Sequence, residues 1–310
     1  GERHIAVKQL LWLEEDGSYR ELRERTSREA ALLEVLGGRY VVRLFADKWE
    51  HASLAMQYVR RDAHAFYHEE LHRYRIVEKL TQQRESAVPV IAHLVHDLLA
   101  GLAELHGYGY MHRDIKLENL LVNCFDEIRS TNCHLLIADL GLACSFKPEQ
   151  LYPCEGVYGN GVYLAPELWR EVTRRRQTAK QWTSPDPHIV AKQDVWSAGV
   201  ALYALLLGKL PKDMFSSVKV MRNPIRAAER WRRHVRRQAK KFDLSIGFLL
   251  ERTLEVDPAK RCSAAECLEM LQSTLPAVVR MEDDAQEHFA NLEIEMQLIR
   301  KCMTGFHRPF

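Results

Sequence analysis

The chain has 310 residues, of which 46% are hydrophobic and 28% are charged, a composition ordinary for a globular protein and unlike a disordered or fibrous one. The formal net charge is only +2, so the average charge indicates no class of partner. There is no apolar run of about eighteen residues, and the seven cysteines show no CxxC spacing and no histidine at zinc-ligand spacing, so neither a membrane span nor a metal–thiolate site is expected.

The first sixty residues predict strands around one helix. Residues 4–12 are rich in apolar and β-branched side chains and predict a strand that carries Lys8. After an EEDGS turn, apolar residues at helical spacing predict a helix from Tyr19 to Leu36, on which Glu29 lies. Two further strands are predicted, over residues 40–49 and 54–59.

The next stretch combines an insertion with a long helix. Residues 60–85 form a long basic connection to which no role is assigned. Residues 87–106 show sustained helical periodicity and include His93 and His96. Histidines on a helix are more often packed or solvated than ligands, so the sequence assigns these two no function.

Residues 111–123, MHRDIKLENLLVN, place one carboxylate, one lysine and one amide within six residues: Asp114, Lys116 and Asn119. Phosphoryl transfer needs such a set, because a carboxylate must orient the attacking hydroxyl, a cation must offset phosphate charge, and oxygen ligands must hold a metal. Twenty residues after Asn119, the stretch IADLGLA places Asp139 before Gly141.

Between these motifs, residues 120–122 and 135–137 predict a pair of strands joined by an enlarged loop. Cys124 and Cys133 stand almost symmetrically about that loop. Facing strand positions lie within disulfide range, so a disulfide across the loop and two reduced thiols are equally compatible with the sequence.

HRDIKLEN, DLG, APE, DVWSAG and DPAKR occur in one order between Lys8 and Arg261, and together they resemble the motif set of protein kinases. The resemblance implies an α+β, bilobal fold. A small β-rich N-lobe, truncated or lacking the glycine-rich hairpin, is expected over residues 1–59. A larger helical C-lobe with enlarged loops and a helical tail is expected over residues 60–310.

The resemblance also implies catalytic and metal roles. Asp114 would orient and deprotonate the substrate hydroxyl, and Lys116 would offset charge on the transferred phosphate. Asn119 and Asp139 would hold Mg²⁺. A lysine two positions after the catalytic aspartate resembles the serine/threonine kinases more than the tyrosine kinases.

For the nucleotide, the resemblance implies that Lys8 binds the ATP phosphates and that Glu29 positions it, with Glu34 as the alternative partner. A kinase hinge contacts adenine through backbone groups, so side-chain identity there is a weak signal. The remaining residues expected around the nucleotide lie on the hinge and on the strand beneath it: Met56, Gln57, Tyr58, Val59 and Leu121.

Supporting contacts follow from the same resemblance. Asp194 is expected to hold backbone groups of residues 111–119, here called the catalytic loop, and Arg261 is expected to pair with Glu167. In the activation segment, residues 139–167, the position usually held by threonine is Asn160. Arg113 often binds an activation-loop phosphate in relatives, so either Glu155 replaces that phosphate here or no such switch exists.

The sequence departs from the kinase pattern before Lys8, where kinases carry a glycine-rich hairpin. None of the fifteen glycines forms the GxGxxG stretch that covers the phosphates in kinases. The missing stretch, the enlarged loops and the cysteines resemble the secreted rhoptry-type kinases of apicomplexan parasites, in particular the branch without a glycine-rich loop. That branch includes active members and a pseudokinase, so two hypotheses stand: a serine/threonine kinase using ATP and Mg²⁺, or a pseudokinase that binds partners. The resemblance also implies secretion to a parasite vacuole or host-facing compartment.

A protein substrate is the expected partner. A second partner is suggested by the stretch that begins at Lys219 and ends at Lys241, which holds ten Lys/Arg residues and one acid, Glu229. Val220, Ile225, Trp231 and Val235 could share one apolar side of a helix there. Such a surface could bind anionic lipid headgroups or an acidic substrate, whereas a solvated helix of the large lobe is the slightly favoured interpretation. Nucleic acid is not expected, because no base-reading motif accompanies the charge.

Overall fold

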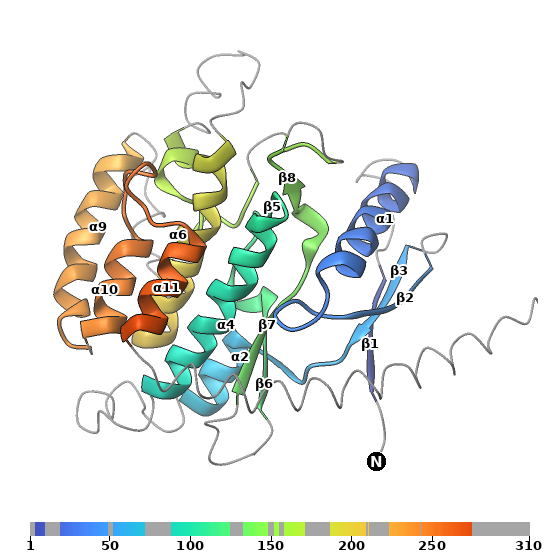
Figure 1. The fold of residues 1–310 in the computed structure, drawn as a ribbon, viewed down its shortest axis with the longest axis horizontal. Helices are drawn as coiled ribbons and strands as arrows, with labels where there is room; N and C mark the ends of the chain where they lie inside the picture. The colour runs from blue at the N-terminus through green and yellow to red at the C-terminus, as the bar shows by residue number, and fades with distance from the viewer. Residues whose placement is uncertain are drawn as a thin grey trace, which may run out of the picture.

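A computed structural model describes residues 4–9, 19–48, 52–71, 88–124, 133–147, 152–154, 158–170, 187–208, 210, 223–242 and 244–274. Figure 1 shows a small strand-rich part, at the right, against a larger helical part, at the left. This is the bilobal α+β arrangement expected from the motifs. The predicted lobe boundary at residues 59–60 and the predicted tail, residues 276–310, stay predictions; the tail lies outside the described residues.

The small part is one antiparallel sheet with a helix packed on it. Its strands are β1 (Ile5–Gln9), β2 (Leu44–Lys48) and β3 (Ser53–Gln57), in the order β1-β3-β2. Helix α1 spans Tyr19–Leu36, as predicted, and buries Leu33 and Leu36. β1 is an edge strand of the described sheet, and Val7 is 63% exposed on it.

The predicted strand over residues 40–49 is too long at its start, because β2 begins only at Leu44. The preceding residues pair with the other part of the molecule instead. Ile137 N donates to Tyr40 O at 2.8 Å, and Val42 N donates to Ile137 O at 2.8 Å. The sequence pattern shows that this segment is extended and apolar, but it does not reveal which partner satisfies its backbone.

A second sheet lies between the two parts. It contains β4 (Arg61–Asp62), β6 (Leu120–Cys124) and β7 (Cys133–Ile137), in the order β4-β6-β7. The predicted pairing of β6 with β7 is confirmed, with Cys124 opposite Cys133. These two cysteines form a disulfide with Cα atoms 4.1 Å apart, so the bonded alternative is the one adopted. A short sheet pairs β5 (Tyr110–Met111) with β8 (Cys144–Ser145).

The helical part is built around two long helices. They are α4 (Val88–Gly107) and α6 (Pro187–Leu207). Every residue of α6 from 193 to 206 is buried, which agrees with its lack of a polar face. The remaining helical elements are α2 (Ala63–Phe66), the π-helix η2 (Tyr67–Leu71), the 3₁₀ turns η3 (Leu117–Asn119) and η4 (Leu140–Leu142), α9 (Pro224–Ala239), α10 (Leu244–Thr253) and α11 (Ala264–Thr274).

The basic stretch forms α9, and its apolar side is not a free surface. Trp231 and Val235 are buried, and the Trp231 ring centroid lies 5.8 Å from that of Trp196 and 5.2 Å from that of Tyr203. The expectation that these apolar residues could face a membrane is therefore wrong, because they complete the core. Val220 lies outside the described residues. Among the helices described, none is both long and apolar enough to cross a membrane.

Candidate active site

The catalytic loop brings its three polar side chains together. Lys116 Nζ donates to Asp114 Oδ2 at 2.6 Å, and Asn119 Nδ2 donates to the same oxygen at 3.0 Å. Asn119 Nδ2 also donates to the Asp114 backbone carbonyl at 2.8 Å, which closes the loop on itself. The structure thus confirms that residues five positions apart in the chain form one cluster around a single carboxylate.

A buried carboxylate holds the backbone of this loop. Asp194, on α6, accepts from His112 N at 2.7 Å and from Arg113 N at 2.9 Å, as the sequence predicted. His106 Nε2 lies 3.0 Å from Asp194 Oδ2. Burial alone would raise the pKa of Asp194, but the hydrogen bonds and charge of these neighbours outweigh it and lower that pKa. The carboxylate therefore stays ionised and anchors the two amides that precede Asp114.

His112 links the catalytic loop to the DLG motif, a contact that the sequence analysis missed. Asp114 N donates to His112 Nδ1 at 3.2 Å, and His112 Nε2 lies 2.9 Å from the carbonyl oxygen of Ala138. A carbonyl only accepts, so Nε2 carries the proton and Nδ1 is the acceptor. This tautomer orients Asp114 relative to Asp139, the residue that follows Ala138. The position of His112 in the HRD motif was the available signal.

On the opposite side, one lysine bridges two carboxylates. Lys8 Nζ, from β1, lies 2.8 Å from both carboxylate oxygens of Glu29 and 2.7 Å from Asp139 Oδ1. Glu29 is 1% exposed, whereas Glu34 lies exposed on the same helix, so Glu29 is the partner. Helix α1 therefore positions the lysine through the expected residue.

Lys8 and Asp139 stabilise each other's charged form, whereas burial, with a smaller contribution from the Asp139 charge, raises the pKa of Glu29. Burial would lower the pKa of Lys8, but the charges of Glu29 and Asp139 raise it above its usual value. Burial would raise the pKa of Asp139, but the Lys8 ammonium lowers it. A Cβ at Gly141 would lie 3.1 Å from Asp139 Oδ1 and 3.3 Å from Glu29 Oε2, so a larger residue would crowd the triad.

The donor set fits Mg²⁺, which prefers carboxylate and carbonyl oxygens. Asn119 uses its amide nitrogen for Asp114, which leaves the side-chain oxygen as the group suited to a cation. The Asp139 carboxylate is 43% exposed and engages Lys8 through Oδ1. Asn119 and Asp139 are therefore the residues that would hold the metal, and Asp114 lies beside Asn119.

The predicted adenine-side residues lie on or just after β3 and on β6. Met56 is half-buried against the main core, and Leu121 packs there from β6. Gln57 N donates to Arg43 O at 2.8 Å, Tyr58 is 48% exposed, and Val59 is half-buried. These positions agree with a connection between the two parts of the molecule, while their contact with a nucleotide stays a prediction.

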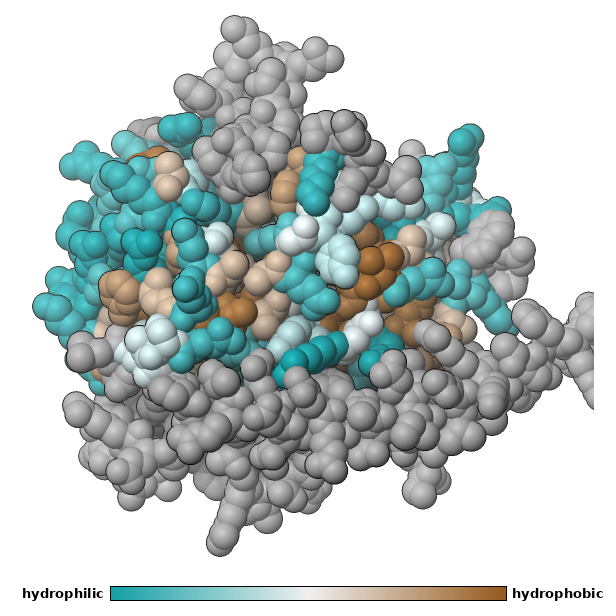
Figure 2. All heavy atoms as spheres, viewed as in Figure 1, coloured by the Kyte–Doolittle hydropathy of each residue, from teal (hydrophilic) through white to brown (hydrophobic). Residues whose placement is uncertain are grey.

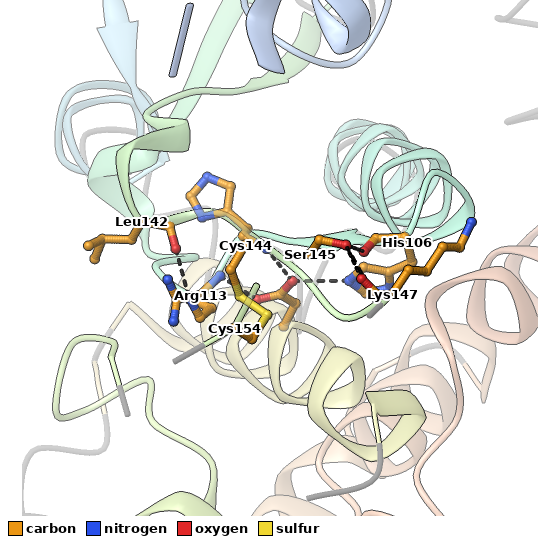
Figure 3. The surroundings of a disulfide bond; sticks show 10 residues. His106, Arg113, Leu142, Cys144, Ser145, Lys147 and Cys154 are labelled. Atoms are coloured by element: carbon orange, nitrogen blue, oxygen red, sulfur yellow. Dashed lines mark hydrogen bonds and ion pairs between the residues drawn. A yellow bond between two sulfur atoms is a disulfide. The ribbon is translucent and has the colours of Figure 1, made fainter. Parts of the chain in front are cut away.

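The start of the activation segment is held by a disulfide that the sequence analysis did not predict. Cys144 and Cys154 are bonded, with Cα atoms 4.9 Å apart. Ser145 N donates to Tyr152 O at 2.7 Å, and Cys154 N donates to Ser145 O at 3.0 Å. Figure 3 shows the disulfide beside Arg113, whose Nε donates to the carbonyl oxygen of Leu142. Cysteine spacing alone does not give connectivity.

Two arginines stack on tyrosines of this segment. Arg113 lies over the ring of Tyr158 and Arg28, on α1, lies over the ring of Tyr152, each at 4.5 Å from the centroid. Burial lowers the pKa of Arg113 to about 10, so the guanidinium remains charged at neutral pH. The face of Tyr158 thus contacts Arg113, the arginine that the resemblance to kinases associates with an activation-loop phosphate. Glu155, the predicted substitute for a phosphate, lies outside the described residues.

The end of the segment is fixed by the predicted ion pair. Arg261 Nη1 and Nη2 donate to the two carboxylate oxygens of Glu167 at 2.8 and 3.0 Å. The Arg261 side chain is fully buried, and its Nη1 and Nε donate to the backbone carbonyls of Lys192 and Glu255. Each guanidinium nitrogen therefore has an acceptor, which is what makes burying this charge tolerable.

Comparison with known proteins shows the family to which the sequence belongs. The family model described as "Protein kinase domain" matches residues 1–271. The chain is 30% identical over 184 residues to the calcium/calmodulin-dependent protein kinase cmkB of Emericella nidulans, covering 57% of the chain and 39% of that protein. It is 29% identical over 204 residues to the calcium/calmodulin-dependent protein kinase type I of Schizosaccharomyces pombe, covering 64% of the chain and 53% of that protein.

The chain is also similar over a longer stretch to the mitogen-activated protein kinase HOG1 of Gibberella zeae. The two are 27% identical over 294 residues, which cover 86% of the chain and 70% of that protein. The matches to the two calmodulin-dependent kinases span only about two fifths and about half of those proteins.

Proposed function

The chain belongs to the protein kinase domain family, and from that premise we propose that it is an active serine/threonine kinase that transfers the γ-phosphoryl group of ATP to a protein hydroxyl. The observation that carries the proposal is that Lys116 and Asn119 both donate to Asp114, while Lys8 bridges Glu29 and Asp139. A chain released from catalysis has no chemical need for all of these residues in contact.

The side chains divide the chemistry as follows. Asp114 accepts the proton of the substrate hydroxyl, and Lys116 offsets negative charge on the transferred phosphate. Lys8, positioned by Glu29, binds phosphate oxygens of ATP. Mg²⁺ held by Asn119 and Asp139 would supply further charge neutralisation. The assignment to serine or threonine rests on Lys116 and on relatives such as the calmodulin-dependent kinases.

The second candidate function is a pseudokinase, a binding module on the same fold. It is favoured by one observation: within the described residues no strand covers the outer edge of β1, where Ile5 and Val7 are exposed. A phosphotransfer assay with radiolabelled ATP separates the two functions. An active kinase labels serine or threonine, and Asp139→Asn abolishes the label. Equal background labelling by the wild type and by the folded variant would support the pseudokinase.

We further propose the rhoptry-type branch and secretion to a host-facing compartment. The described residues contain three disulfides, Cys124–Cys133, Cys144–Cys154 and Cys262–Cys267, and disulfides persist in oxidising compartments. To test this, free thiols are alkylated while the cells that naturally produce the protein are lysed, and the modified cysteines are identified by mass spectrometry. Six protected cysteines at these positions are expected, whereas alkylated cysteines would remove this support.

We propose an anionic membrane surface as an additional partner. Trp231 and Val235 are buried, so binding rests on charge alone, on exposed basic side chains of α9 such as Arg226, Arg230 and Arg233. Figure 2 shows hydrophilic side chains gathered over this helix at the left edge of the molecule. Each basic residue near an anionic bilayer contributes about 1 kcal/mol. Flotation with phosphatidylserine liposomes should show binding that salt abolishes, and absence of binding at low salt would refute it.

A further inference from the structure

Three metal-ligating side chains meet outside the active site, between α4 and β7. His93 and Asp97 lie one helical turn apart on α4, and His134 lies on β7. His93 Nε2 is 3.2 Å from His134 Nδ1 and 3.8 Å from Asp97 Oδ2, and His134 Nδ1 is 3.4 Å from Asp97 Oδ2. Among the described residues, this is the group of three such side chains whose ligand atoms converge.

These separations, 3.2, 3.4 and 3.8 Å, lie closer to a tetrahedral than to an octahedral arrangement of ligands. Zinc binds nitrogen and oxygen at roughly 2.0–2.2 Å, so two ligands of a regular tetrahedron lie about 3.3–3.6 Å apart. Adjacent ligands of an octahedral Mg²⁺ at roughly 2.1 Å would lie only about 3.0 Å apart. Imidazole ligands also favour zinc over magnesium. We propose that His93, Asp97 and His134 form a Zn²⁺ site.

The surroundings are those of a built site. His93 is 1% and Asp97 is 3% exposed, so neither is a solvated surface group. Leu135 N donates to Asp97 Oδ2 at 3.0 Å, which orients the oxygen that faces both histidines. The other carboxylate oxygen, Oδ1, lies 3.4 Å from His96 Nδ1. Such outer contacts hold a ligand in position and tune its basicity.

The support extends to a third element. His96 Nε2 lies 3.2 Å from Gln272 Nε2, so α11 orients the histidine that contacts Asp97. The His134 side chain is 13% exposed, which leaves an approach for the ion and for a water in the fourth position. Three protein ligands with an outer shell from α4, β7 and α11 are therefore in place.

A metal ion at this site would link two elements that are far apart in the chain. It joins α4, which forms the core of the helical part, to β7, the strand that leads directly to Ala138 and Asp139. His134 is next to Cys133, whose disulfide closes the loop between β6 and β7. Zinc would therefore hold the hairpin between β6 and β7 against α4. This inference is independent of whether the chain is an active kinase.

The test is calorimetric titration of the whole chain with ZnCl₂ in excess Mg²⁺, which occupies the oxygen ligands of the active site. The wild type should bind one zinc ion. His134→Ala should lower the zinc affinity by more than the roughly 10- to 100-fold expected from losing a residue that only hydrogen-bonds to a metal ligand. His134 is half-buried, so this variant should stay folded. Asp97→Asn, which keeps an acceptor for Leu135 N, should weaken binding as well.

The matched control is His64→Ala, which removes an exposed histidine whose ring centroid lies 4.5 Å from that of His68. This variant should bind zinc as the wild type does. Co²⁺ should give the visible absorption of tetrahedral coordination in the wild type and not in His134→Ala. Absence of zinc binding, or binding that His134→Ala leaves unchanged, would overturn the proposal.

Discussion

On the helical side of the site, the catalytic loop is held by buried groups: Asp194 accepts two backbone amides, and His112 connects Asp114 to Ala138. On the strand side, Lys8 lies on an edge strand paired with β3, and its ammonium is held by the side chains of Glu29 and Asp139. The first arrangement is independent of nucleotide. The second shares Asp139 between a lysine and the expected metal.

The difference indicates that the helical side determines the rate of transfer, whereas the strand side determines the affinity for ATP. Groups that act on the hydroxyl are preorganised by the core, so they should contribute to rate whatever the affinity for ATP. Groups that bind phosphate depend on a few charged contacts, so affinity should respond strongly to the metal.

The largest effect is expected on the helical side. Asp114→Asn keeps hydrogen-bonding capacity towards Lys116 and Asn119 but removes the base, so kcat should fall by about 10²- to 10⁴-fold. The KM for ATP should change little, because Asp114 does not bind phosphate. Steady-state phosphotransfer measures both constants. Near wild-type kcat would show that Asp114 is not the base.

Removal of Mg²⁺ is the matching change on the strand side. In the described sheet Lys8 is the side chain placed to bind phosphate, so the metal held by Asn119 and Asp139 should carry much of the binding. Hydrogen bonds to charged groups contribute roughly 1.5–3 kcal/mol each, so losing two contacts of that strength with the metal would lower the affinity for ATP about a hundredfold or more. Calorimetric titration with ATP, with and without chelator, tests this. Low-micromolar affinity that survives chelation would contradict it.

A smaller effect is expected from Glu29→Ala. Glu29 acts through Lys8 and does not touch the reacting atoms, so its loss should reduce kcat/KM by about tenfold, within the range of other outer contacts. Glu34→Ala, on the same helix but exposed, is the control and should leave kcat/KM unchanged. Equal effects of the two changes would mean that helix stability, and not lysine positioning, explains the loss.

The smallest change in activity is expected from the double variant Cys144→Ser/Cys154→Ser. The disulfide holds the start of the activation segment beside Arg113, so its loss should lower activity severalfold and stability by up to about 2–4 kcal/mol. Cys262→Ser/Cys267→Ser removes a disulfide at the start of α11 and serves as control. The unfolding temperature should fall for both double variants, whereas the rate of phosphotransfer should fall only for Cys144→Ser/Cys154→Ser. An unchanged rate in that variant would show that the disulfide does not support the activation segment.

Much of this site could be predicted from the sequence because its residues lie in short motifs. Asp114, Lys116 and Asn119 lie within one loop, and helix periodicity alone gave the bounds of α1 and placed Glu29 on it. The same reasoning failed where contacts join distant segments. Tyr40 and Val42 pair with Ile137, which local pattern does not encode.

The missed contacts share that cause. Arg28 on α1 meets Tyr152 across more than a hundred residues, and His93 on α4 meets His134 on β7, 41 residues later in the chain. Local periodicity also showed α9 as an amphipathic helix without indicating that Trp231 faces Trp196 inside the core. Only the folded arrangement shows which apolar side is already covered.

The most direct test of kinase activity measures phosphotransfer as a function of ATP concentration at saturating Mg²⁺, for the wild type and Asp139→Asn. We expect measurable transfer by the wild type. We expect no transfer by Asp139→Asn at any ATP concentration. A wild type that transfers no more phosphate than Asp139→Asn at high ATP, although both are folded, would contradict this expectation.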